Sequence, residues 1–148
     1  MAVENPLNLS EIDYIVVECF HIAGFVVTVG MTAIVDFRLL GVILPKQSPQ
    51  QLASITSWGM AVGLTVAVFT GFILFSVDPD SYLTNTTFLI KMACLCLAIA
   101  LNFTIHRRAL LPGAALFGGK IVACISLALW IWTVFCGIFI AGDLLHIR

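Results

Sequence analysis

Four long apolar runs decide what this chain can fold into. They span residues 14–35, 53–76, 87–105 and 119–142. A helix that crosses the hydrocarbon core of a membrane needs roughly 20 mostly apolar residues, and each run meets that length. The composition agrees, because 61% of the residues are hydrophobic and only 10% are charged. Such a chain lacks the polar surface that covers a soluble globule, so we expect an all-α integral membrane protein.

The connections between the runs are short, which makes consecutive helices antiparallel. We therefore predict one transmembrane domain over residues 1–148, an up-down four-helix bundle without a soluble domain. The first helix is expected to continue as an interfacial extension to about residue 44, because Pro45 blocks it there.

The basic residues predict the orientation of the bundle. We call the membrane side that holds both chain ends side A, and the opposite side is side B. Side B receives most of the lysines and arginines, namely Arg38, Lys46, Arg107, Arg108 and Lys120. An excess of Lys and Arg marks the cytoplasmic side. We therefore expect a multi-pass protein of the bacterial cytoplasmic (inner) membrane with both termini on the periplasmic side.

Ionisable residues lie within the first and third runs. Glu18 and Asp36 are 18 residues apart, which is about five helical turns, so they point the same way. Lys91 and His106 share one face of the third helix. At a rise of about 1.5 Å per residue, Glu18 and Lys91 both lie about 6 Å below side A, whereas Asp36 and His106 lie about 33 and 28 Å below it.

Two cross-helix pairs follow from these depths. We predict that Glu18 pairs with Lys91 near side A, and that Asp36 pairs with His106 or Arg107 near side B, with Arg38 as a further candidate. The pairs are either clasps that fix the helix register or parts of a conduit for protons or ions. The clasp is favoured, because buried charged residues pair even where nothing is transported.

His21 and the sulfur-bearing residues raise the question of a cofactor. A haem b held by His21 and Met92 is an alternative, since both lie about 8 to 10 Å below side A. A bis-His haem is disfavoured, because no second histidine lies at that depth. Copper could be held by soft ligands in the side A half, but ordinary packing is the simpler interpretation for Cys19, Cys94, Cys96 and Cys136.

Gly59 and Gly63 form a G-x-x-x-G pattern that lets another helix approach closely. Packing inside the bundle is the main interpretation, and dimerisation is the alternative. The sequence contains none of the phosphate-binding or nucleophile motifs of common enzymes. A net charge of −1 gives no reason to expect a nucleic-acid partner.

The segment HIAGFVVTVGMTAIVDFRLLG, residues 21–41, resembles the first helix of an uncharacterised family of small four-helix bacterial membrane proteins. The segments WGMAVGLTVAVFTGFILF and FLIKMACL and the Trp-bearing fourth run resemble the same family. Its layout is similar to the membrane domain of copper-resistance D proteins and, more distantly, to transmembrane b-type cytochromes. The resemblance places His21, Asp36, Arg38 and Lys91 at pattern positions, and it implies no assigned activity.

Taken together, these features predict a non-catalytic subunit or module of a membrane assembly. Its expected partners are the lipid bilayer and either a second copy of the chain or another membrane or periplasmic protein. The alternatives are a haem b electron-transfer module that uses His21 and a copper or proton permease.

Overall fold

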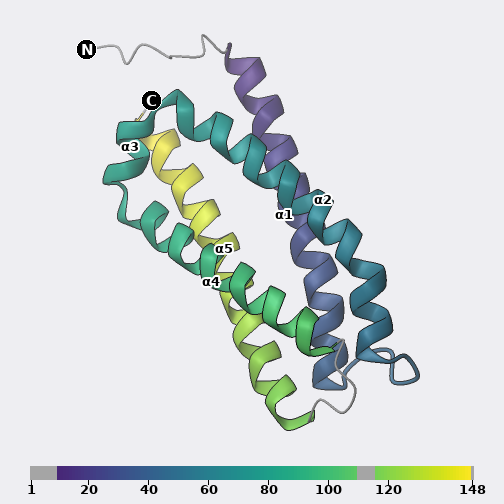
Figure 1. Ribbon diagram of the computed structural model, residues 1–148. Helices are drawn as coiled ribbons and strands as arrows, with labels where there is room; N and C mark the ends of the chain where they lie inside the picture. The colour runs from purple at the N-terminus through teal and green to yellow at the C-terminus, as the bar shows by residue number, and fades with distance from the viewer. Residues whose placement is uncertain (1–9, 110–115, 148) are drawn as a thin grey trace.

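The computed structural model describes the backbone of residues 10–109 and 116–147, and side chains for residues 10, 12–104 and 119–140. Throughout these backbone segments the only regular elements are helices (Figure 1). They are α1 (Glu11–Leu40), α2 (Pro49–Val77), α3 (Pro79–Thr84), α4 (Thr86–Ala109) and α5 (Leu116–Ile147).

Four of these helices are long and apolar enough to cross a membrane, over Ile12–Leu40, Pro49–Val77, Thr86–Thr104 and Gly119–Ile140. The expectation of an all-α protein with four such helices is therefore confirmed, and it supports a multi-pass membrane protein. The helices alternate in direction, so α1 begins and α5 ends at the same end of the bundle (Figure 1).

Local capping chemistry sets where the first two helices begin and end. The Ser10 hydroxyl accepts a bond from the Asp13 backbone N–H, and the Asp13 carboxylate accepts one from the Ser10 N–H. Gly41 takes a left-handed conformation (φ 83°), so α1 ends at Leu40 rather than near residue 44 as predicted. Ser48 caps α2, with Pro49 at the first helical position.

The short helix α3 lies in the connection between the second and third apolar runs. Asp78 caps its first turn by accepting from the Ser81 N–H, and Pro79 follows at the first helical position. Asn85 ends α3 and caps α4, where its side-chain oxygen accepts from the Thr87 and Phe88 N–H groups. The D-P and N-T-T patterns in the sequence carry these signals.

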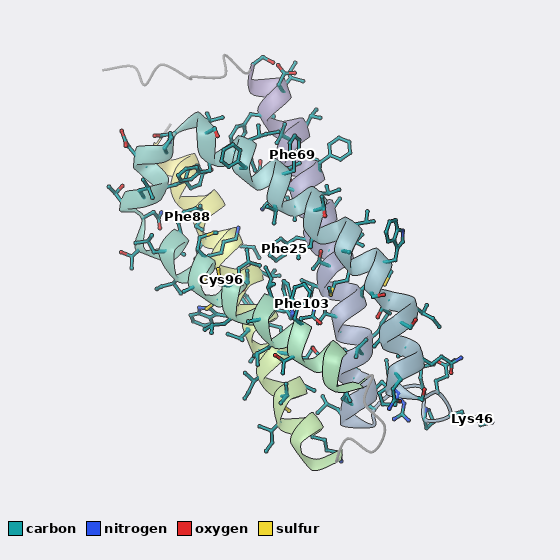
Figure 2. The ribbon with its side chains drawn as sticks, in the orientation of Figure 1. Phe25, Lys46, Phe69, Phe88, Cys96 and Phe103 are labelled. Carbon is teal, nitrogen blue, oxygen red and sulfur yellow. The ribbon has the colours of Figure 1, made fainter. Side chains whose placement is uncertain are left out.

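The long helices form two hairpins. α1 packs along α2 and α4 packs along α5, while α1 also touches α5 and α2 touches α4 only sparingly (Figure 1). Figure 2 shows the Phe25 ring between the two hairpins, in the middle of the bundle. The interior therefore lies between the α1–α2 hairpin and the α4–α5 hairpin.

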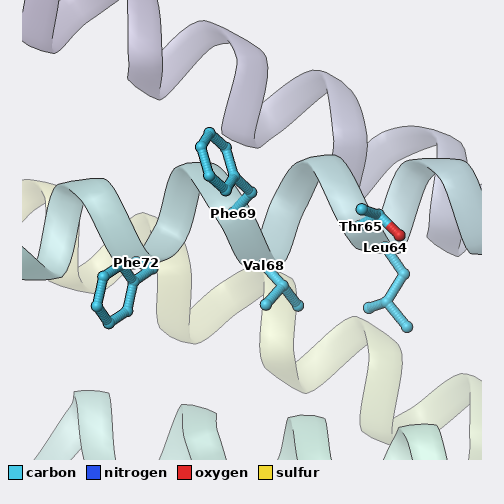
Figure 3. Close-up of a pocket in the computed structure, with 5 residues that line it drawn as sticks. All are labelled: Leu64, Thr65, Val68, Phe69 and Phe72. Carbon is cyan, nitrogen blue, oxygen red and sulfur yellow. The ribbon is translucent and has the colours of Figure 1, made fainter.

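The outer faces of the helices are apolar. Large exposed hydrophobic side chains occur on every long helix, among them Phe20, Trp58, Phe103 and Phe139. A shallow groove on the outside of α2 is lined by Leu64, Thr65, Val68, Phe69 and Phe72 (Figure 3). Apolar faces of this kind suit contact with lipid chains, because lipid tails are as apolar as the side chains that they touch.

The closest helix contact joins α1 and α2 at two glycines. A Cβ atom on Gly24 would lie 2.8 Å from the Gly63 carbonyl oxygen and 2.9 Å from the Ala67 nitrogen. A Cβ atom on Gly63 would lie 2.8 Å from both the Gly24 oxygen and the Thr28 hydroxyl. Gly59 packs against Met31. The predicted G-x-x-x-G pattern is thus placed in a seam within the chain.

We expect Gly24→Ala to destabilise the bundle by about 1–3 kcal/mol, because the new methyl group would meet backbone atoms that cannot rotate away. The matched control is Gly30→Ala on the same helix, since nothing lies within 4 Å of a Cβ atom there. Thermal unfolding in mild detergent measures both. Equal effects at the two positions would contradict this account of the seam.

Candidate functional site

Two tyrosines mark the interior at the end where α1 begins. The hydroxyls of Tyr14 and Tyr82 are 3.3 Å apart. Burial raises the pKa of Tyr82, and the Tyr14 hydroxyl and the nearby carboxylates of Glu18 and Asp78 add to that effect. The Tyr82 phenol therefore stays neutral at ordinary pH. Glu18 thus lies near α3, on the side A end of the bundle.

His21 is held by the backbone of α2. Its Nδ1 atom lies 2.8 Å from the Ala67 carbonyl oxygen and 3.2 Å from the Thr70 hydroxyl. The carbonyl can only accept, so Nδ1 carries the hydrogen and Nε2 keeps its lone pair. The ring lies against Gly71, where a Cβ atom would come within 2.9 Å of Cε1. The absence of a side chain at Gly71 therefore leaves the space that the imidazole ring occupies.

Lys91 points into the interior from α4. Its ammonium group lies 5.8 Å from the centre of the Phe25 ring, within range of a cation–π contact. It also lies 3.4 Å from where a Cβ atom on Gly137 would be, so it sits against the α5 backbone beside Cys136. The His21 ring contacts the same Phe25 ring at 5.9 Å.

The structure does not join Glu18 and Lys91 as an ion pair. Among the residues with described side chains, no carboxylate forms a salt bridge with the Lys91 ammonium, which instead contacts Phe25 and Gly137. Glu18 lies near Tyr82. The Lys91 side chain turns instead toward Phe25 of α1 and the backbone of α5 at Gly137.

The structure also separates the two haem ligands that the sequence suggested. His21 faces α2, whereas the Met92 side chain is 40% exposed on α4. No group of three or more His, Cys, Asp or Glu residues that could hold a metal ion occurs in the described part of the chain. Cys19 and Cys96 are exposed on the outer surface. Nothing in these contacts supports haem or copper.

A polar layer in the middle of the bundle connects three helices. The Asn102 amide on α4 donates to the Thr32 hydroxyl on α1 at 3.0 Å and contacts the Met60 sulfur on α2 at 2.6 Å. The Thr32 hydroxyl in turn donates to the Thr28 carbonyl oxygen. This layer fixes the register of the two hairpins.

Asp36 lies one turn beyond this layer and is completely buried. Neither of its carboxyl oxygens has a hydrogen-bond partner among the described residues. The Ser126 hydroxyl on α5 lies beside the carboxyl without reaching hydrogen-bond geometry, and it too lacks a partner there. The Trp130 indole N–H lies one turn along α5 from Ser126. It is also buried and has no hydrogen-bond partner among the described residues.

The partners that the sequence suggested for Asp36 are placed as follows. Arg38 turns away, since its guanidinium donates to the carbonyl oxygens of Gln47 and Pro45 in the α1–α2 loop. The side chains of His106 and Arg107 lie outside the described residues. On the side B flank, Asp36 adjoins an apolar cluster formed by Val35, Leu39, Ala53 and Val122.

We name this set of interior side chains the polar column: His21, Lys91, Thr32, Asn102, Asp36 and Ser126. From the sequence alone, His21, Lys91 and Asp36 of this set are predicted site residues, whereas Ser126 and Trp130 are not. A signal for both exists, because Ser126, Trp130 and Thr133 recur at intervals of four and three residues and so share one face of α5.

No protein-family model matches the chain, and neither a curated protein nor a solved structure shows significant similarity to it. The chemistry of the polar column therefore has to be argued from its own geometry.

A double-mutant cycle tests the separation of Glu18 from Lys91. We expect the coupling free energy between Glu18→Gln and Lys91→Met to stay below about 0.5 kcal/mol, as for residues that share no contact. A cycle between Lys91→Met and Phe25→Leu is the positive control, because these side chains do touch. Unfolding in mild detergent measures both cycles. A coupling of 1 kcal/mol or more between Glu18 and Lys91 would restore the clasp.

Proposed function

We propose that this chain is a small membrane module that moves cations across the bilayer through the polar column, without chemistry of its own. One observation carries the proposal: Asp36 is completely buried while both carboxyl oxygens lack a hydrogen-bond partner among the described residues. An acidic group at membrane depth that no described neighbour satisfies is a place where a cation can bind.

The energetics favour transport over a structural clasp. An ionisable residue inside a membrane-spanning bundle is costly to insert, so such residues either pair with one another or serve a function. A clasp recovers that cost by pairing its charge. Asp36 and Lys91 form no such ion pair with described side chains, and they lie far apart on the column.

The arrangement of the column supports a path along the bundle. His21 and Lys91 lie toward the end where α1 begins, Thr32 and Asn102 follow in the middle, and Asp36 lies toward the opposite end. The column lies between the two hairpins, which touch mainly through α1 and α5 and only sparingly through α2 and α4. Haem and copper have no part in this proposal, since His21 and Met92 face different ways.

Flux through reconstituted liposomes tests the function. We expect Asp36→Asn to lower potential-driven cation uptake at least about tenfold, which corresponds to a loss of about 1.4 kcal/mol of cation stabilisation. Proton and sodium uptake are followed separately with dyes selective for each ion. The matched control is Thr65→Val, because Thr65 is exposed on α2 and its hydroxyl donates only to Ala61 of the same helix.

The same variants separate transport from a clasp. The transport proposal expects Asp36→Asn to be at least as stable as the parent protein, since the amide has nearly the same shape and cannot become a buried charge. A variant that unfolds more easily but transports normally would refute the proposal and support the clasp.

We also propose that side B is the cytoplasmic side of a bacterial inner membrane. Lys46 and the start of α5 with exposed Lys120 lie at the same end of the bundle (Figure 2). The Tyr14–Tyr82 pair lies at the other end, where aromatic residues with polar tips suit the membrane interface.

Thiol labelling in intact cells tests the orientation. We expect a cysteine placed by Lys46→Cys to be protected from a membrane-impermeant maleimide, and one placed by Asp80→Cys in α3 to react. A chain in which the native cysteines are replaced by serine provides the background. The opposite pattern of labelling would invert the proposed orientation.

A further inference from the structure

We propose, resting on the cation-moving function above, that the species bound at Asp36 is a proton, held as a neutral carboxylic acid beside Ser126. Two features of the described residues around Asp36 favour a proton over other cations: the small number of unpaired side-chain oxygen atoms and the absence of a neighbouring charge.

A metal cation would find too few oxygen ligands at this position. Hard cations that lose their water need about six oxygen ligands. The unpaired side-chain oxygens that the described residues offer here are the two carboxyl oxygens of Asp36 and the Ser126 hydroxyl. The Thr32 hydroxyl is already committed, because it donates to the Thr28 carbonyl at 2.9 Å and accepts from Asn102 at 3.0 Å. A proton needs one oxygen atom only.

The described surroundings of Asp36 carry no charge that would stabilise a carboxylate. On its own helix, Arg38 is bound to loop carbonyls. The buried polar side chains that α2, α4 and α5 contribute near this level, among the described residues, are Thr56, Asn102 and Ser126, none of which titrates at ordinary pH. The side chains of His106 and Arg107 on α4 lie outside the described residues. Lys91 contacts Phe25, which is about 16 Å from Asp36 along the helix axis.

A neutral acid avoids this problem. Burying an unpaired carboxylate is far more costly than burying its protonated form, so the acid is the stable state at a site like this. The O–H of the neutral acid could also donate a hydrogen bond to the Ser126 hydroxyl oxygen after a small movement of either side chain. Release breaks the O–H bond, leaves the electron pair on the carboxylate and passes the proton to water on the receiving side.

Infrared spectroscopy of the purified full-length protein tests the inference. We expect the carbonyl stretch of a protonated carboxylic acid at pH 7, where an exposed aspartic acid is ionised. Asp36→Asn should abolish that band, and Asp13→Asn should leave it, because Asp13 is exposed and bonded to Ser10. Should Asp36→Asn fail to fold, Ser126→Ala provides the assignment, since removing the neighbouring hydroxyl should shift the band.

The ion dependence of the band decides between proton and metal. Exchanging sodium chloride for choline chloride at constant pH should leave the band unchanged. A missing band at pH 7, or a band that sodium removes, would overturn the inference. Sodium flux with no proton flux would overturn it while leaving the cation-moving function intact. A sodium-insensitive band assigned to Asp36 in a protein without any cation flux would end the proposed function but leave the proton site standing.

Discussion

The backbone contact between α1 and α2 at Gly24 and Gly63 is the constraint on which the rest of the structure depends. With no side chains between the two backbones, the Gly24 face of α1 is fully used by α2. Asp36 lies about 120° around the helix from Gly24, and Phe25 about 100°, at 3.6 residues per turn. The seam therefore directs the acidic face of α1 toward α4 and α5. A bulkier residue in the seam would rotate or displace α1 and move Asp36 with it.

The sequence predicted the four long helices, but it could not predict which polar groups meet. The apolar runs identified all four helices, and the 18-residue interval predicts that Glu18 and Asp36 share one face of α1. Depth matching then suggested the pair Glu18–Lys91, but depth fixes only the height of a Cα atom. A lysine side chain is long and flexible, and here it turns toward the Phe25 ring and the space left by Gly137. Such choices depend on how α4 is rotated about its axis, which the helical period does not determine.

Lys91 and Asp36 are opposite charges on one column, yet they do not neutralise each other when both are ionised. Phe25, which Lys91 contacts, lies about 16 Å from Asp36 along α1. Two unit charges about 16 Å apart attract each other by about 1 kcal/mol at an effective dielectric constant of about 20. That is less than the cost of burying either charge, so each group is governed by its own surroundings. The Asp36 carboxyl group has no hydrogen-bond partner among the described residues. The Lys91 ammonium group contacts the face of the Phe25 ring and the α5 backbone at Gly137.

This separation bears on how a cation could pass the level of Lys91. A metal ion at that level would lie beside the Lys91 ammonium group and be repelled by it. No carboxylate among the described side chains forms an ion pair with Lys91 that would offset this repulsion. A proton has another route, because His21 lies at the same level and its ring also contacts Phe25. The bond from Nδ1 to the Ala67 carbonyl leaves the Nε2 lone pair free to accept a proton. A histidine near one end of the column and an isolated acid near the other therefore suit proton transfer better than the passage of a metal ion.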